Sequence, residues 1–289
     1  MTDFNGAYVT GLFDKSNDCV SGNTAGAMAA SVMTDYVFWS VHVSPQGDLG
    51  YNNVSLASGG QIVAETVNCL KAVADAGRGS GELQRVWLSI GAGGTSDFTN
   101  IADILNATDG RRETMLANFA AVANALGACG FDYDNEDQIG NVEVITGLTA
   151  ALYGDNSAWR FSFCPYGNSS YASQYWIQCL QAIFKQLGTQ PVVGFNLQCY
   201  SGGSDSDPDG WQQAVEGAGS GSTGITDANA LIRPGLSVTG GPDPYTPSEA
   251  TSALKGWNSS GGWIWNSEIV LDNPSDTIAD YGQAIAAGT

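Results

Sequence analysis

The chain has 289 residues, of which 43% are hydrophobic, and this is enough apolar material for a sizeable core. Asp and Glu outnumber Lys and Arg by 29 to 10, so the formal net charge of -19 would repel phosphate backbones and anionic lipids. Nucleic acid and membranes are therefore excluded as expected partners, and the sequence has no uninterrupted apolar run that would span a bilayer.

Short runs rich in β-branched and aromatic residues alternate along the chain with longer Ala- and Leu-rich segments. The runs expected to form strands are 6–13, 35–43, 85–93, 129–136, 159–167, 191–202, 233–241 and 261–268. The segments expected to form helices are 60–77, 111–129, 142–154, 169–188 and 246–257. Eight strands, each followed by a helix or by enough chain to hold one, predict a single-domain (β/α)8 TIM barrel over residues 1–289. A doubly wound α/β sheet is the alternative, although it usually needs fewer strands.

The six cysteines lie at positions 19, 69, 129, 164, 179 and 199 and form no Cys-x-x-Cys pair. Cys129, Cys164 and Cys199 lie in or beside apolar runs, where a free thiol behaves as a small buried hydrophobe. We therefore expect mostly unpaired cysteines. This indicates either a cytoplasmic protein or a secreted one whose signal peptide is absent from this sequence.

His42 is the only histidine, so the chain offers no Cys and His spacing suited to structural zinc. No Gly-x-Ser-x-Gly motif accompanies it, and a Ser-His-Asp hydrolase is not expected. We expect His42 to be a hydrogen-bonded core residue of the second strand.

Residues 128–138 read ACGFDYDNEDQ and place carboxylates at alternate positions, Asp132, Asp134 and Glu136. Alternate side chains of a strand share one face, so all three are expected inside the barrel, with the residues between them toward the helices. Desolvation and mutual repulsion should raise the pKa of at least one carboxyl, so that it can serve as a general acid at neutral pH. A metal site or a solvated strand end fits less well, because only Glu136 would reach the mouth of the barrel.

This strand resembles the Asp-Gly-x-Asp-x-Asp-x-Glu motif of glycoside hydrolase family 18, the chitinases and endo-β-N-acetylglucosaminidases. Residues 129–136, CGFDYDNE, match every specified position of that motif except the first. The third strand carries LSIGAGG, which is similar to the family's Ser-x-Gly-Gly, with Ser89 and Gly91 in place and Ala92 where the second glycine is usual. The resemblance covers nearly the whole barrel and implies the same fold.

Two positions of the fourth strand depart from the family pattern. Cys129 replaces the first Asp, and strand alternation places it on the side opposite the carboxylates, so we expect it to affect packing alone. Asn135 directs a polar group toward the helices and needs a hydrogen-bond partner there.

The sixth and eighth strands resemble the family as well. In FNLQCYSGG, Gln198 and Tyr200 take the places of a Met or Gln and of a Tyr two positions later. In SGGWIWNS, Trp265 takes the place of the Trp that forms the floor of the sugar subsite. Trp39 and Tyr166, near expected strand ends, are further candidates for stacking against sugar rings.

The resemblance implies a retaining glycosidase whose substrate supplies the nucleophile. By the family pattern, Glu136 protonates the glycosidic oxygen and later activates water, while Asp134 orients the 2-acetamido group. Tyr200 donates a hydrogen bond to the carbonyl of that group, and Asp132 shares a proton or hydrogen bond with Asp134. We expect a monomer that needs no cofactor.

The leading substrates are β-1,4-linked N-acetylglucosamine glycans, namely chitin or chito-oligosaccharides. Two alternatives stay open. One is an endo-β-N-acetylglucosaminidase that cuts the core of N-glycans, and the other is a chitinase-like carbohydrate-binding protein without activity.

A second acidic stretch, SDSDPDGWQQAVEG at 204–217, matches the calcium-loop pattern D-x-D-x-D-G-x5-E, with Asp205, Asp207, Asp209 and Glu216 as the candidate ligands. A proline inside the loop and a strand leading into it argue against calcium. The favoured interpretation makes Asp207 or Asp209 the N-cap of a following helix.

Overall fold

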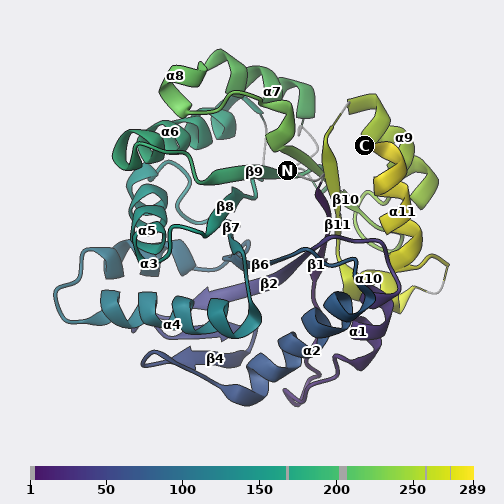
Figure 1. Cartoon of the computed structure of the whole chain (residues 1–289), viewed down its shortest axis with the longest axis horizontal. Helices are drawn as coiled ribbons and strands as arrows, with labels where there is room; N and C mark the ends of the chain where they lie inside the picture. The colour runs from purple at the N-terminus through teal and green to yellow at the C-terminus, as the bar shows by residue number, and fades with distance from the viewer. Residues whose placement is uncertain (1–3, 167–168, 202–206, 258, 274) are drawn as a thin grey trace.

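A computed structural model of the chain describes all residues except 1–3, 167–168, 202–206, 258 and 274, with residues 169–173 described by their backbone alone. Figure 1 shows the strands arranged as a central ring, with the helices outside it. The chain runs once around this ring, from purple at the bottom through teal on the left and green at the top to yellow on the right.

Parallel strands form the ring. They are β1 (Phe4–Val9), β2 (Asp35–Val43), β6 (Arg85–Ile90), β7 (Gly130–Tyr133), β8 (Arg160–Phe163), β9 (Val192–Gln198), β10 (Ile232–Ser237) and β11 (Gly261–Trp265). β1 pairs with both β2 and β11, and this double pairing closes the sheet. The predicted (β/α)8 barrel is thus confirmed. The doubly wound alternative is wrong, because such a sheet has open edges.

Helices cover the outside of the ring. They are α1 (Gly22–Ala29), α2 (Ala64–Ser80), α3 (Asp97–Leu105), α4 (Arg111–Leu126), α5 (Val142–Asp155), α6 (Ser169–Leu187), α7 (Pro208–Gly217), α8 (Ser220–Thr223), η2 (Asn229–Leu231), α9 (Pro247–Trp257), α10 (Ser267–Asp272) and α11 (Ile278–Gly288). All the helices predicted from the sequence are present, with shifted ends. In the described part of the chain, no helix has the length and apolar character needed to cross a bilayer.

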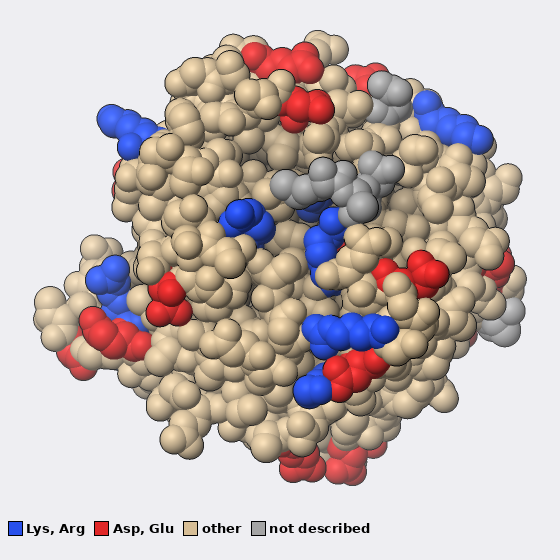
Figure 2. All heavy atoms as spheres, viewed as in Figure 1, with Lys and Arg blue, Asp and Glu red and all other residues tan. Residues whose placement is uncertain are grey.

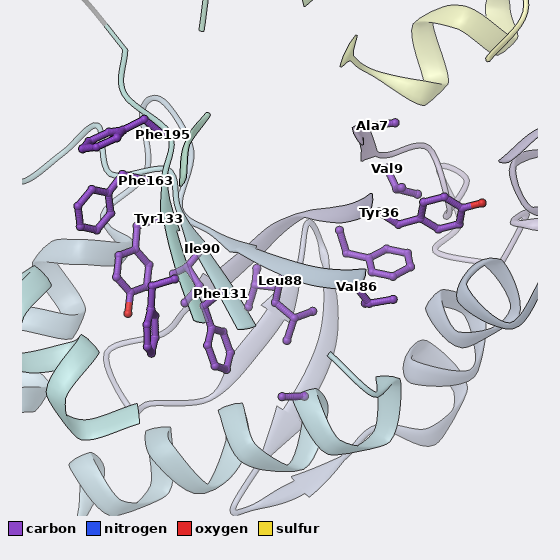
Figure 3. Packing of buried hydrophobic residues seen from close by; sticks show 14 of the residues in the cluster. Ala7, Val9, Tyr36, Val86, Leu88, Ile90, Phe131, Tyr133, Phe163 and Phe195 are labelled. Carbon is purple, nitrogen blue, oxygen red and sulfur yellow. The ribbon is translucent and has the colours of Figure 1, made fainter. Parts of the chain in front are cut away.

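The outward faces of the strands carry aromatic rings that pack against the helices. Tyr133 on β7, Phe163 on β8 and Phe195 on β9 lie in a row, with ring centroids 6.1 and 5.6 Å apart, and Figure 3 shows this row. Trp176 on α6 stacks on Phe163 at 4.6 Å. Because neighbouring residues of a strand face opposite sides, this packing directs Asp132 into the barrel.

A hairpin that the sequence pattern does not mark extends the sheet beyond β2. Its antiparallel strands are β3 (Leu49–Tyr51), β4 (Val54–Ser58) and β5 (Gln61–Ile62). Asn52 in its first turn has φ 51°, a left-handed conformation that asparagine tolerates. The buried Asn118 of α4 anchors the hairpin, since its side chain donates to Gly47 O at 2.8 Å and accepts from Gly60 N at 2.7 Å.

Most cysteines were expected to lack a disulfide, and four of the six do, but one pair is bonded. Cys19 and Cys69 form a disulfide that links the loop after β1 to α2. The other cysteines, Cys129, Cys164, Cys179 and Cys199, take no part in a disulfide. The bonded pair is 50 residues apart in sequence and meets because α1 packs against α2, so no local pattern marks it.

The two departures from the fourth-strand motif have different outcomes. Asn135 donates from its side-chain amide to Tyr175 Oη on α6 at 2.9 Å, which confirms the expected partner in the helix layer. The prediction for Cys129 is wrong, because its side chain packs against the cluster that fills the barrel interior. Cys129 precedes the first residue of β7, so the alternation of that strand does not govern its direction.

Candidate active site

The structure places Asp132, Asp134 and Glu136 inside the barrel, at and beyond the carboxyl end of β7. Asp132 is fully buried, Asp134 is 4% exposed and Glu136 is half-buried. The carboxylates thus run from the packed interior to the mouth of the barrel, where the loops after the strands lie.

Asp132 accepts four hydrogen bonds, two on each oxygen. Oδ1 accepts from Ser162 Oγ at 2.6 Å and Asn196 Nδ2 at 2.9 Å. Oδ2 accepts from Tyr8 Oη at 2.7 Å and Ser89 Oγ at 2.8 Å. Burial raises the pKa of this carboxyl above its usual value, and the hydrogen bonds offset part of that rise. Four donors match the acceptor sites of an ionised carboxylate, so the surroundings suit Asp132 as a fixed anion.

Sequence reasoning missed the donors to Asp132 as members of the site. Tyr8, Ser89, Ser162 and Asn196 lie on four different strands, each at an inward position. Ser89 belongs to the third-strand motif, although that motif did not mark it as a partner of Asp132. Tyr8, Ser162 and Asn196 belong to no motif, and each is only a polar residue within a mostly apolar strand. Which of these residues reach the same depth depends on the stagger of the strands, and that is a property of the closed barrel.

Asp134 lies between two donors and another acid. Trp39 Nε1 donates to Oδ2 at 2.9 Å, and Gln198 Nε2 donates to Oδ1 at 3.1 Å and to Glu136 Oε1 at 3.3 Å. Burial raises the pKa of Asp134 well above its usual value, and the negative charge of Glu136 raises it further. We find no hydrogen bond between Asp132 and Asp134 in the described structure. The raised pKa lets Asp134 keep its proton to a higher pH than an ordinary aspartate does.

Glycines of the third-strand motif make room for these carboxyl groups. A Cβ at Gly93 would stand 2.8 Å from Glu136 Oε2, and one at Gly91 would stand 2.5 Å from the backbone oxygen of Asp134. Gly91 also has φ +92°, a conformation that residues with a side chain rarely adopt.

A cavity of about 240 Å³ opens above Asp134. Its walls are Trp39, Ala92, Gly93, Asp134, Glu136, Tyr166, Gln198, Tyr200, Ser201, Pro242 and Trp265. Every catalytic and sugar-binding residue predicted from the sequence lines this cavity except Asp132, which supports it from below.

Aromatic side chains form the floor and one wall of the cavity. Trp265 lies edge-on to Trp39, with centroids 4.7 Å apart, and is nearly parallel to Tyr200 at 6.0 Å. Tyr166 is 41% exposed and donates to Ser201 O at 2.7 Å. The hydroxyl of Tyr200 bonds to no described residue, and burial raises its pKa, so it remains a phenol that can donate to a ligand.

His42 is hydrogen-bonded through both ring nitrogens, as expected, but its side chain is 28% exposed and is not part of the core. Nδ1 contacts Asp97 Oδ2 at 2.8 Å, and Nε2 contacts Ser40 Oγ at 2.9 Å. The order of groups is that of a Ser-His-Asp triad, but Ser40 is only 1% exposed, so no substrate reaches its hydroxyl. The three side chains instead join α3 to the end of β2, directly after Trp39.

The acidic stretch after β9 begins a helix. Asp205 lies outside the described residues. Asp207 occupies the N-cap position of α7 without a side-chain cap bond, and Glu216 accepts from Gln212 Nε2 at 3.1 Å. Across the described residues, no group of three or more His, Cys, Asp or Glu side chains could hold a metal ion. The described part of this stretch therefore follows the helix-start interpretation.

Enzymes with a (β/α)8 barrel carry their active sites at the carboxyl ends of the barrel strands. In this chain the inward carboxylates lie at the carboxyl end of the fourth barrel strand. No protein-family model matches the chain, and no curated protein sequence matches it. Solved structures do match. A fungal endo-β-N-acetylglucosaminidase of glycosyl hydrolase family 18 is 17% identical, with a TM-score of 0.64 and 98% of each chain covered.

Two further matches cover the whole barrel. The catalytic domain of a hyperthermophilic chitinase from Pyrococcus furiosus is 10% identical, with a TM-score of 0.67 over 99% of this chain and 95% of that one. A chitinase-like agglutinin from Robinia pseudoacacia is 12% identical, with a TM-score of 0.65 and 99% of each chain covered. The protein therefore has the fold of the family-18 glycoside hydrolases.

Proposed function

We propose that the protein is a family-18 glycoside hydrolase that cleaves β-1,4 linkages of N-acetylglucosamine glycans with retention of configuration. The observation that carries this proposal is the cavity itself. Asp134 and Glu136 line it beside Tyr200 and Trp265, and the fully hydrogen-bonded Asp132 lies beneath them.

Glu136 is the general acid and base. It is the carboxyl group nearest the mouth, so it can reach a glycosidic oxygen above the cavity. As it protonates that oxygen, the carbonyl oxygen of the substrate's own acetamido group attacks the anomeric carbon and the glycosidic bond breaks. In the second half of the reaction Glu136 takes a proton from the water that opens the cyclic intermediate.

Asp134 and Tyr200 hold the acetamido group during this attack. Tyr200 donates a hydrogen bond from its hydroxyl to the carbonyl and stays protonated, and Asp134 accepts a hydrogen bond from the amide N–H while its own proton passes to Glu136. The anion of Asp132 stays in place and raises the pKa of Asp134 by repulsion. Gln198, which donates to both upper carboxyl groups, keeps them side by side.

Trp265 supplies the floor on which the reacting sugar stacks, and Trp39 and Tyr166 border the same space. Chitin and chito-oligosaccharides are the leading substrates because they are neutral and carry an acetamido group on every residue. The core of an N-glycan offers the same linkage and remains the second substrate class. A carbohydrate-binding protein without activity is the third, since a chitinase-like agglutinin shares the fold.

The test is product analysis by mass spectrometry after incubation with chitopentaose and, in parallel, a high-mannose glycoprotein. Glu136→Gln removes the acid with little change of shape, and Glu65→Gln on α2 is the matched control. Shorter chito-oligomers from the wild type and Glu65→Gln, absent with Glu136→Gln, support a chitinase, whereas released glycan moves the assignment to the endoglycosidase.

A binding measurement with chitopentaose distinguishes an enzyme from a carbohydrate-binding protein without activity. Glu136→Gln should still bind chitopentaose, because the aromatic floor is intact. Unchanged turnover in Glu136→Gln would contradict the assigned acid. Saturable binding without product from the wild type would identify a carbohydrate-binding protein.

A further inference from the structure

A second cavity, of about 280 Å³, lies at the opposite end of the barrel. It is lined where strands begin, by Phe4 of β1, Val193 of β9 and Arg233 of β10, with Leu231 before β10 and Ser260 before β11. The proposed active site lies at the carboxyl ends of the same strands, so the two cavities are separated by the filled interior of the barrel.

Arg233 is the cation of this cavity and is only 5% exposed. Its Nη2 donates to Val193 O at 2.6 Å, and its Cζ lies 4.3 Å from the centre of the Phe4 ring. Nε and Nη1 are buried and have no hydrogen-bond partner within the described structure. Burial lowers the pKa of Arg233 to about 10, so the guanidinium is still charged at neutral pH.

The charges of Asp35 and Asp132 act on Arg233, but neither carboxylate forms an ion pair with it in the described structure. Asp35 accepts from Arg85 through both oxygens, at 2.5 and 2.6 Å, and from Trp87 Nε1 at 2.9 Å. Both oxygens of Asp132 already accept two hydrogen bonds each from other side chains. A buried charge without a partner is costly, so an anion that reached Arg233 would be bound favourably.

The surroundings define the kind of anion. Phe4, Val193 and Leu231 make most of this wall apolar, and the exposed Asp227 also lines the cavity, where it would repel a multiply charged ligand. Figure 2 shows basic side chains near the centre of its view and acidic ones mostly toward the edge.

We propose that this cavity binds a small organic monocarboxylate, with its charge on Arg233 and its alkyl part against the apolar wall. A guanidinium matches the geometry of a carboxylate better than that of a spherical ion, which favours a carboxylate over chloride. The apolar wall favours a short alkyl chain over acetate, by about fourfold in affinity for each added methylene.

Titration calorimetry with sodium butyrate and sodium acetate, at an ionic strength held constant with sodium chloride, tests the proposal. Saturable binding is expected, tighter for butyrate. Arg233→Met should weaken it by about ten- to a hundredfold, the loss typical of a hydrogen bond to a charged group. The matched control is Arg160→Met. Arg160 begins β8, which is separated from β10 by β9, and its Nη1 donates to the backbone oxygens of Ser157, Ala158 and Trp159.

A second variant keeps the cation and fills the space. Ala230 is exposed and lines the cavity, so Ala230→Trp should block butyrate binding while leaving Arg233 in place. If Arg233→Met does not fold, the Ala230→Trp variant tests the proposal by itself. Glu136→Gln should bind butyrate as the wild type does, which separates this cavity from the proposed active site. No saturable binding to the wild type, equal binding by the Ala230→Trp variant, or equal competition by chloride would each overturn the proposal.

Discussion

Gly93 lies against the carboxyl group of Glu136, and a Cβ there would stand 2.8 Å from Oε2. We predict that Gly93→Ala folds but displaces Glu136, because the contact is with the far end of a side chain that can rotate. A displacement of about 1 Å at a reacting group can reduce turnover by about 10²-fold. Steady-state kinetics on chitopentaose measure this loss, and Gly79→Ala on α2, where nothing lies within 4 Å, is the control. Wild-type kcat in Gly93→Ala would show that Glu136 does not need this space.

Asp134 gives a second prediction at the residue scale. Its pKa is raised in the folded protein, chiefly by burial, so the folded state holds its proton to higher pH than the unfolded state does. The wild type should lose stability as the pH rises from the ordinary value of 3.8, and Asp134→Asn should lose less because it cannot ionise.

Urea unfolding from about pH 4 to about pH 8 checks this through the difference between the two proteins, which should grow with pH. Hydrogen bonds that the variant loses add a constant offset and leave that slope unchanged. Asp103→Asn on the exposed side of α3 controls for net charge. A difference that does not vary with pH would mean that Asp134 ionises as easily in the folded protein as in the unfolded one.

Among the elements, the loop after β1 is held by the disulfide from Cys19 to Cys69 on α2. The bond closes 50 residues of chain, for which the loss of unfolded-state entropy corresponds to about 4 kcal/mol of stability. We predict that replacing both cysteines by alanine lowers the free energy of unfolding by about this amount. Reductant should bring the wild type to the same value and leave the variant unchanged. A wild type indifferent to reductant would show that the bond adds nothing to stability.

The barrel strands could be predicted because each is a short apolar run with its own local signal. β3 and β5 could not, since they span only three and two residues and exist through pairing with β2 and β4. α1 was missed because its eight residues include two glycines, which favour helix poorly, and its burial against α2 stabilises it.

Some residues of the candidate site could likewise be predicted from the sequence and others could not. Asp134, Glu136, Gln198, Tyr200 and Trp265 were found because a family motif fixes their spacing. The pairing of Trp39 Nε1 with Asp134 joins residues 95 positions apart, and the donors around Asp132 come from four strands. Such contacts are set by the closure of the barrel, which no local pattern records.

For the whole molecule, charge is the dominant long-range term. The sequence has 29 acidic and 10 basic residues, and the described structure forms only a few ion pairs, such as Arg85 with Asp35 and Lys71 with Asp75. Most acidic groups therefore repel one another through solvent, and this repulsion is greater in the compact state.

We predict that salt stabilises the protein. Raising sodium chloride from about 0.01 M to about 0.15 M shortens the screening length from about 30 Å to about 8 Å, which weakens this repulsion. Each kcal/mol relieved should raise Tm by about 2–4 °C, as measured by circular dichroism at neutral pH. Potassium chloride should act equally, because screening does not depend on the cation, and the turnover of a neutral oligosaccharide should change little. A Tm that falls with salt would mean that local attractive pairs outweigh the net charge of -19.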